Sequence, residues 1–147
     1  MAQHRFLVRA HYAGGVAGRG GLRADGLECS ISAAKTMGGS GIGTNPEELL
    51  LGAACNCYLI TLTAIAARRG IPIAKVELES EVFVEAGERL RIDRIVHRPT
   101  ITLAESATSE QRTQAVDVAR LAESACIVSV ALRGNVAVDV ELAVSSQ

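Results

Sequence analysis

The stretch GTNPEELLLGAACNCYLITLTAIAARRG, residues 43–70, constrains the fold of this chain more than any other segment. Asn45 can cap a helix, Pro46 suits the first helical position, and the two glutamates that follow complement the positive end of a helix dipole. Two arginines and then Gly70 are typical of a helix end. Residues 49–67, between these signals, carry no charged side chain. The sequence therefore predicts one long helix that is apolar on nearly all sides.

Such a helix can be a membrane span or the core helix of a globular protein. Nineteen uncharged residues are about enough to cross a bilayer. However, polar and small residues dilute the apolar character of this stretch; they include Gly52, Asn56, Thr61, Thr63 and two cysteines. The segments around it also alternate between apolar and polar residues. We therefore expect a central core helix, covered by a sheet and by a partner subunit, and no membrane span.

Strand patterns surround this helix. Apolar and polar residues alternate in residues 4–12, 27–32 and 135–144, as is typical of half-buried strands. Residues 75–103 show two such runs around a turn at residues 86–88, which predicts a hairpin with a bulge in its return strand. The glycine-rich residues 13–21 are predicted as a loop.

A second helix follows the hairpin. Thr108 with Gln111 three residues later forms a capping-box pattern, and the helix is expected to run to about Ala125. Residues 126–132 extend it or form a short third helix. The resulting order β-β-α-β-β-α-β favours an α+β fold with antiparallel sheets packed against helices. The length of 147 residues fits a single domain that spans residues 1–147.

Composition excludes several classes of function. Aromatic residues make up 3% of the chain, and the net charge is −1, which argues against a nucleic-acid partner. The glycine-rich residues 37–44 lack both the P-loop ending and the spacing of a dinucleotide-binding loop. No secretory signal precedes the first strand, so we expect a cytoplasmic protein with reduced thiols.

Four cysteines, at positions 29, 55, 57 and 126, match no zinc spacing, and we expect no metal or bound cofactor. Cys29 and Cys55 are interpreted as packing residues. Cys57 and Cys126 lie in helical segments of the two halves of the chain. Such a distant pair, in a chain without an export signal, suggests catalysis more than a structural disulfide. The spacing alone leaves open whether the two thiols meet.

Two motifs resemble the OsmC/Ohr family of osmotically inducible and organic hydroperoxide resistance proteins. GTNPEELLLGAACNCYLI resembles the family's helix-start motif, and AESACIVSVALRGNVAVDVEL resembles its second cysteine motif and last strand. A glycine-rich GGVAGRGG lies upstream, where the family carries an arginine. The resemblance covers nearly the whole chain. It implies an OsmC-like α+β fold, an intertwined homodimer and a cysteine-based peroxidase.

The resemblance also implies roles for individual residues. Cys57, ten residues after Glu47 of the Asn-Pro-Glu motif, corresponds to the peroxidatic cysteine, and Cys126 to the resolving cysteine. Arg19 corresponds to the arginine of the glycine-rich loop, with Arg23 as the neighbouring candidate. The chain departs from the family in two ways: Ile127 stands where a proline usually follows the second cysteine, and Cys55 is an additional thiol.

The chemistry of such a site places demands on these residues. A peroxidatic cysteine attacks as a thiolate, whereas burial in an apolar helix raises a thiol pKa. A cation is therefore required, and the resemblance implies that Arg19 supplies it while Glu47 orients its guanidinium. On a straight helix, however, Glu47 and Cys57 are about 15 Å apart. Either the helix breaks near Gly52 or the site combines two chains, and we favour two chains.

The expected substrates are organic hydroperoxides, reduced to alcohols through a Cys57 sulfenic acid and a Cys57–Cys126 disulfide. The resemblance implies a dithiol reductant such as a dihydrolipoyl group on a lipoylated protein. Two alternatives stay open. One is a non-catalytic OsmC-like module that binds an apolar ligand. The other is a metal site built from the two cysteines and His4, His11 or His97, although no histidine has ligand spacing to either cysteine.

Overall fold

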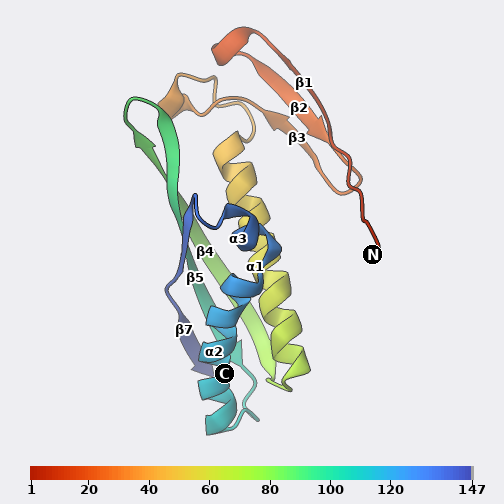
Figure 1. Cartoon of the computed structure of the whole chain (residues 1–147), viewed down its shortest axis with the longest axis vertical. Coiled ribbons are helices and arrows are strands. Elements are labelled where there is room, and N and C mark those ends of the chain that lie inside the picture. The colour runs from red at the N-terminus through yellow and green to blue at the C-terminus, as the bar shows by residue number, and fades with distance from the viewer. Residues whose placement is uncertain (147) are drawn as a thin grey trace. The chain divides into compact units, whose positions relative to one another are not determined.

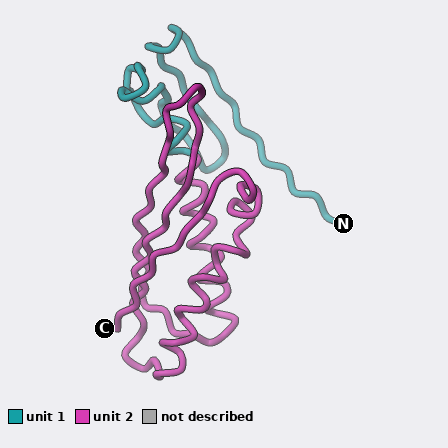
Figure 2. The backbone as a smooth tube through the Cα atoms, turned by 60° about the vertical axis from the view of Figure 1, so that its left-hand side comes forward, with its two compact units in different colours: residues 1–49 teal, residues 50–147 magenta. Residues whose placement is uncertain are grey.

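The computed structural model describes residues 1–146, and their contacts divide the chain into two units (Figure 2). Unit 1 is Met1–Leu49 and unit 2 is Leu50–Gln147. Unit 1 carries a small antiparallel sheet whose strand order is β1-β2-β3. Its elements are β1 (Arg9–Ala13), a 3-10 turn η1 (Gly15–Ala17), β2 (Arg19–Arg23), β3 (Glu28–Ile31) and a second 3-10 turn η2 (Lys35–Met37).

Strand β1 begins later than its sequence pattern predicts. The alternation starts at residue 4, but the strand starts at Arg9, which pairs with Arg23 at the far end of β2. Residues 4–8 have no further β2 residue opposite them, and their side chains are exposed. The length of the partner strand, which the alternation does not report, sets the length of β1.

Strand β2 begins within residues 13–21, which the sequence predicts as a loop, so that prediction is wrong from Arg19 onward. Its glycines permit close packing of backbones: a Cβ atom added at Gly20 would lie 1.9 Å from the carbonyl oxygen of His11 on β1. Glycine serves here as a close-approach residue within a strand rather than as a turn residue.

Helix α1 (Pro46–Arg68) confirms the predicted long helix. The Asn45 side chain accepts a hydrogen bond from the Glu48 backbone N–H at 2.9 Å, and Gly70 adopts a φ of 66° after the last turn. By length and composition alone, α1 could span a membrane. Its buried residues nevertheless lie in the core of unit 2, as expected for a core helix; they are Ala54, Tyr58, Leu62 and Ala66.

The sheet of unit 2 is built on a long hairpin of β4 (Ile73–Ala86) and β5 (Leu90–Leu103). The predicted bulge is confirmed, because the register shifts between Phe83 and Val84. The last alternating run forms two strands rather than one: β6 (Ala137–Val140) and β7 (Ala143–Ser146). Both run parallel to β5, because the two helices between β5 and β6 carry the chain back across the sheet.

Helices α2 (Ser109–Ala125) and α3 (Ile127–Leu132) form that connection. The predicted capping box is present, with Thr108 and Gln111 each accepting a hydrogen bond from the other's backbone N–H. In unit 2, α1 and α2 lie on the same face of the β4–β5 sheet (Figure 1). The α+β class is confirmed, with a sheet packed against a long helix.

The core of unit 2 lies between these layers. Fully buried Tyr58 and Leu62 of α1 pack with Ile101 and Leu103 of β5 and with the small residues of α2; the latter are Ala115, Val118, Ala119 and Ala122. Burying a leucine side chain of this kind stabilises a fold by roughly 1.5–3 kcal/mol.

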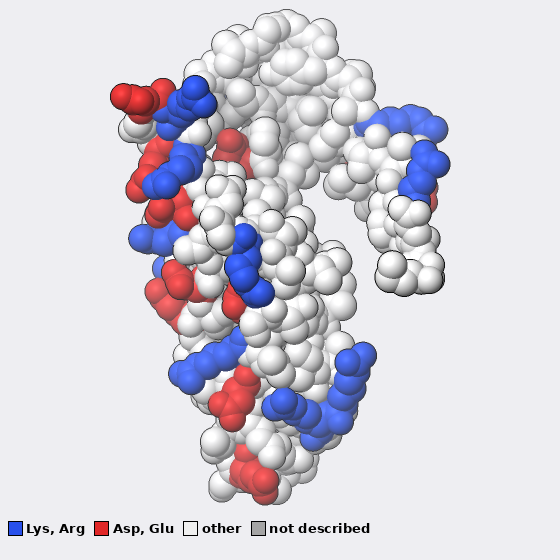
Figure 3. Space-filling view, viewed as in Figure 1, with Lys and Arg blue, Asp and Glu red and all other residues white. Residues whose placement is uncertain are grey.

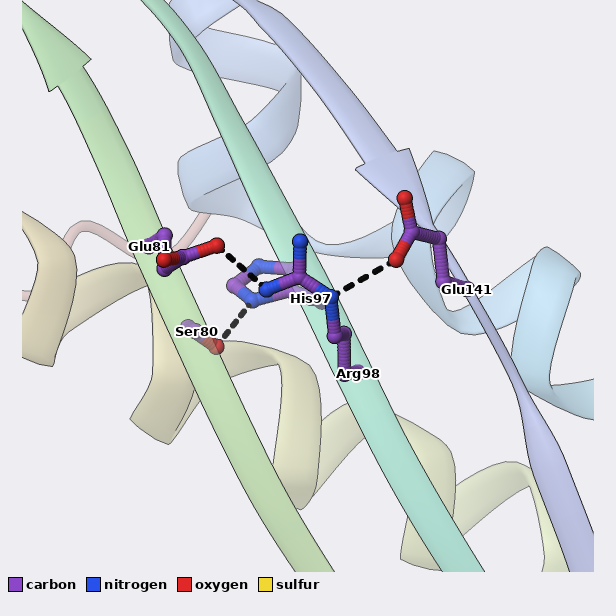
Figure 4. A network of polar contacts seen from close by, with 5 residues as sticks. All are labelled: Ser80, Glu81, His97, Arg98 and Glu141. Atoms are coloured by element: carbon purple, nitrogen blue, oxygen red, sulfur yellow. Dashed lines mark hydrogen bonds and ion pairs between the residues drawn. The ribbon is translucent and has the colours of Figure 1, made fainter.

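The opposite face of the sheet is polar. Arg98 lies between Glu81 and Glu141, with nitrogen–oxygen distances of 2.5 and 2.7 Å, and thereby links β4, β5 and the β6–β7 connection (Figure 4). On the face drawn in Figure 3, basic and acidic side chains are interspersed along the side formed by the hairpin. Neither sign forms a continuous patch on that face.

Candidate functional site

Cys57 lies in the middle of α1, at the edge of the core of unit 2. The next residue, Tyr58, is 0% exposed, and its hydroxyl donates a hydrogen bond to the Ala119 carbonyl of α2 at 3.0 Å. Consecutive side chains on a helix point about 100° apart. With Tyr58 fixed in the core, Cys57 is therefore held at the margin, where it is partly exposed.

Cys126 lies at the junction of α2 and α3 and is fully buried. Its backbone is extended, with φ −67° and ψ 124°, so it ends one helix and precedes the other. Its N–H donates to the carbonyls of Ala122 and Glu123, which ties the junction to the last turn of α2. The Cys126 thiol lies near enough to Cys57 to lower the pKa of Cys57, and Cys57 raises the pKa of Cys126. The two thiols are therefore close in the folded chain, a question that their spacing in the sequence left open.

The surroundings of Cys57 favour its thiolate. Burial raises the pKa of Cys57, but hydrogen bonds from the Cys126 thiol, the Val128 N–H, the Thr61 hydroxyl and the Ile127 N–H lower it, and the net shift is downward. Hydrogen bonds to the charged form of a group stabilise that form. The pKa of Cys57 is therefore lowered by groups of unit 2 alone.

The surroundings of Cys126 act in the opposite direction. Burial raises the pKa of Cys126, its hydrogen bond with Cys57 raises it further, and weaker contacts with Ser129 and Val128 do not reverse the shift. The Ser129 hydroxyl lies beside the Cys126 sulfur, but it is buried and makes no well-aligned hydrogen bond within residues 1–146. Of the two thiols, Cys57 is the one prepared to ionise.

Glu47 and Arg19 lie in unit 1, which contains neither of these thiols. Glu47 is in the first turn of α1, and one carboxylate oxygen, Oε2, is buried and has no hydrogen-bond partner in the described part of the chain. Arg19 begins β2 and is exposed. No ion pair joins Arg19 to Glu47 within unit 1, so the structure does not bring this predicted pair together.

The segment before α1 fixes the position of Glu47. Thr44 pairs with β3 through backbone hydrogen bonds to Ser30 and Ser32, and its hydroxyl donates to Glu48 at 2.8 Å. Gly43 has φ 75°, and a Cβ atom there would lie 2.1 Å from the Ser30 carbonyl oxygen. Only glycine fits at position 43, where the chain passes close to β3 just before α1 begins.

His97 is the one histidine buried in unit 2, on β5. Its Nδ1 lies 2.7 Å from the Ser80 hydroxyl of β4 (Figure 4), and its ring stacks on Tyr58 at a centroid distance of 5.0 Å. Burial lowers the pKa of His97. Among residues 1–146, no group of three metal-binding side chains gathers at one place. His97 thus packs as a neutral core residue and is bonded to a hydroxyl rather than to a thiol.

Sequence reasoning missed three contributors to the thiol environment. Thr61 stands four residues after Cys57, a spacing that places two side chains on the same helix face, and this signal was available. Ser129 and the successive backbone N–H groups at the start of α3 had no local signal, because their proximity to Cys57 depends on how α3 packs. Cys55 and Cys29 are half-buried, as Cys57 is, so their interpretation as packing residues stays a prediction.

Comparison with known proteins places this geometry in a family. The sequence model of the OsmC-like proteins matches residues 38–141. The uncharacterized protein YmaD of Bacillus subtilis (strain 168) is 38% identical over 145 residues, which are 98% of this chain and 97% of that protein.

Solved structures agree with this assignment. The organic hydroperoxide resistance protein OsmC of Legionella pneumophila is 25% identical, has a TM-score of 0.73, and aligns over 97% of this chain and 99% of its own. The organic hydroperoxide resistance protein OhrB of Bacillus subtilis is 27% identical, with a TM-score of 0.68, over 93% and 98% of the two chains. On this evidence, the chain belongs to the OsmC-like protein family.

Proposed function

We propose that this protein is a cysteine-based peroxidase that reduces organic hydroperoxides to alcohols. The observation that carries the proposal is the contact between a partly exposed Cys57, whose pKa is lowered, and a buried Cys126. A peroxidatic thiol must be ionised and accessible, and a resolving thiol must be close to it. Two relatives of known structure that are called organic hydroperoxide resistance proteins support the same reaction class.

In the proposed reaction, the Cys57 thiolate attacks the distal oxygen of the hydroperoxide. The O–O bond breaks, the alkoxide takes a proton and leaves as an alcohol, and Cys57 becomes a sulfenic acid. The Cys126 sulfur then attacks the Cys57 sulfur, an S–S bond forms, and the hydroxyl leaves as water. An external dithiol, for which we propose a dihydrolipoyl group on a lipoylated protein, reduces this disulfide and is itself oxidised to a disulfide. No bound cofactor takes part in this scheme.

We assign Arg19 and Glu47 to the stabilisation of the thiolate and of the departing oxygen. The buried Oε2 of Glu47, without a partner in residues 1–146, is suited to a guanidinium, because a buried carboxylate is stable when it is paired. Of the two candidate arginines, Arg23 lies opposite Glu28 in the sheet, whereas Arg19 lies opposite Ala13 and has no acidic neighbour across the strand. Arg19 is therefore the better candidate to pair with Glu47.

We infer that the active form is an intertwined homodimer. Helix α1 is continuous from Pro46 to Arg68, so the alternative of a break near Gly52 is wrong, and Glu47 stays about 15 Å along the axis from Cys57. A site that uses both residues then requires two chains. Ile60 of α1 is 61% exposed in the single chain, which is consistent with an apolar surface that a second subunit covers. Full activity of a protein that stays monomeric at high dilution would contradict this inference.

An apolar recess of about 260 Å³ in unit 1 supports an organic substrate. Its lining residues are Tyr12, Ile31, Ser32, Ala33, Pro46 and Leu49. The recess also supports the second candidate function, an OsmC-like module that binds an apolar ligand without chemistry. The two functions differ in one measurable respect: only the peroxidase oxidises Cys57 stoichiometrically when an organic hydroperoxide is added.

The deciding experiment compares Cys57→Ser, Cys126→Ser and the control Cys55→Ser, which alters a neighbouring thiol of α1. Activity is measured with cumene hydroperoxide and either dihydrolipoamide or a monothiol. We expect Cys57→Ser to abolish peroxide reduction, Cys126→Ser to stop at a sulfenic acid on Cys57, and Cys55→Ser to stay active. If neither Cys57→Ser nor Cys126→Ser loses activity, this function is wrong.

A further inference from the structure

One face of the β1–β3 sheet in unit 1 carries two arginines directly opposite each other. Arg9 of β1 pairs with Arg23 of β2, and Arg23 pairs on its other side with Glu28 of β3. The side chains of directly opposite residues in an antiparallel pair lie on the same face of the sheet, and like charges placed in this way destabilise it. A negative group bound between the two arginines would relieve this repulsion.

The chain itself does not supply that negative group. Within residues 1–146, neither Arg9 nor Arg23 forms an ion pair, although Glu28 lies opposite Arg23 and Asp25 follows β2. Both arginines are exposed. The row formed by Arg9, Arg23 and Glu28 has two positive charges and one negative charge, so its net charge is +1.

A groove of about 720 Å³ opens over these strands. In the next row of the same face, His11 lies opposite Gly21, and Gly21 lies opposite Ser30. A Cβ atom added at Gly21 would lie 2.8 Å from Cε1 of His11, so the imidazole ring leans over the glycine. The polar side chains that line the groove are Arg9, His11, Arg23, Glu28 and Ser30. The groove therefore combines two unpaired guanidinium groups with an open floor.

We propose that this groove is a binding site for an aromatic carboxylate, which is held between the guanidinium groups of Arg9 and Arg23. A guanidinium donates two parallel hydrogen bonds to a carboxylate, and its flat face stacks on aromatic rings. The single negative charge of a carboxylate also matches the net charge of +1, whereas Glu28 repels the second charge of a phosphate dianion. The site uses neither the two thiols nor Arg19, so it is independent of the proposed peroxidase function.

The test is an NMR titration of the full chain, labelled with ¹⁵N, at constant ionic strength. The probes are sodium benzoate, its neutral analogue benzamide, and inorganic phosphate. We expect benzoate to shift the backbone amide signals of β1–β3 with a dissociation constant on the order of 1 mM, as for a ligand of this size in an open site. Benzamide should give no saturable shifts, and phosphate should bind more weakly than benzoate.

Arg9→Gln and Arg23→Gln should each weaken benzoate binding about tenfold, as for loss of a hydrogen bond between charged groups. Both variants remove a like-charge pair from the sheet, so the fold should tolerate them. The control Arg69→Gln removes the same charge from an exposed arginine of unit 2 and should leave the dissociation constant unchanged. Glu28→Gln removes the repelling charge and should tighten the binding of benzoate, and that of phosphate by a larger factor.

Three results would overturn the proposal. Benzoate could cause no saturable shifts in β1–β3, or Arg69→Gln could weaken its binding as much as Arg23→Gln does, which would indicate diffuse attraction to the whole protein. Phosphate could also bind as tightly as benzoate, which would indicate a general anion site. Cys57→Ser should bind benzoate with an unchanged dissociation constant, so failure of the peroxidase function and failure of this site are distinguishable.

Discussion

Cys57 and Cys126, which shift each other's pKa, occupy opposite environments in unit 2. Cys57 is partly exposed on the side of a long helix and receives hydrogen bonds that lower its pKa. Cys126 is fully buried at a helix junction, and burial raises its pKa. Chemically identical side chains in contact are therefore prepared for different tasks. The difference arises from burial and from groups that act on one sulfur only: Thr61 and Ile127 on Cys57, and Ser129 on Cys126.

This contrast shows how a resolving thiol can stay inactive until it is needed. The neutral Cys126 thiol donates to the Cys57 sulfur, and this bond stabilises Cys57 as a thiolate while it keeps Cys126 protonated. Once Cys57 is oxidised to a sulfenic acid, the negative charge that holds the Cys126 proton is gone. Under the proposed function, the same contact supports the first step and releases the second thiol for the next.

Alkylation of the reduced protein tests the contrast most strongly. We expect iodoacetamide to modify Cys57 on the order of 100-fold faster than Cys126 at neutral pH, because ionisation and access both favour Cys57. Quenched time points and peptide mass spectrometry give the two rates separately, and Cys55 on the same helix serves as a reference for exposure alone. If Cys126 reacts first, the assignment of the two environments is reversed.

Local signals predicted the elements on which these thiols lie. Asn45 and Pro46 predict the start of α1, and Thr108 with Gln111 predicts the start of α2, because capping depends on residues three or four apart. The parallel pairing of β6 and β7 could not be read from alternation, which reports a buried face but not the direction of the neighbouring strand.

The candidate site was only partly predictable, for a similar reason. Cys57 and Cys126 were singled out by two motifs, and their contact is consistent with that choice. The N–H groups of Ile127 and Val128 carry no residue-type signal, since almost any amino acid supplies an N–H. The roles of Arg19 and Glu47 stay predictions, because these two residues and the thiols lie in different units. The single domain over residues 1–147 also stays a prediction.

The fold is expected to lose stability in acid because of His97, which stacks on Tyr58 in the core of unit 2. Buried His97, stacked on Tyr58, has a lowered pKa, so the unfolded chain binds a proton more readily than the folded one. The free energy of unfolding should therefore be highest above about pH 6.5, the usual pKa of a histidine. It should fall as the pH drops below this value, by at most about 1.4 kcal/mol per pH unit. Urea unfolding at several pH values measures this slope.

His97→Asn removes this titration, whereas the control His11→Gln alters an exposed histidine of unit 1. We expect the slope between pH 5 and pH 6.5 to shrink in His97→Asn and to persist in His11→Gln. An unchanged slope in His97→Asn would show that another group controls the acid response.

Ser129→Ala should produce the smallest effect and confine it to one sulfur. The Ser129 hydroxyl contacts Cys126 and lowers its pKa, but it makes no contact with Cys57 that affects the pKa of Cys57. This hydroxyl is also buried without a well-aligned partner in residues 1–146. Its removal in Ser129→Ala therefore leaves no new unpaired group and should hardly change the free energy of unfolding.

Under the proposed function, Cys57 oxidation by cumene hydroperoxide should then keep its rate in Ser129→Ala. Disulfide formation should slow about two- to fivefold, because the Cys126 thiol is harder to ionise without the hydroxyl. Trapping with dimedone in single-turnover experiments should reveal a longer-lived sulfenic acid on Cys57, and Ser124→Ala, an exposed serine of α2, should behave like the original protein. Equal slowing of both steps would mean that the two sulfurs do not have separate environments, because a group beside Cys126 alone would then control Cys57 as well.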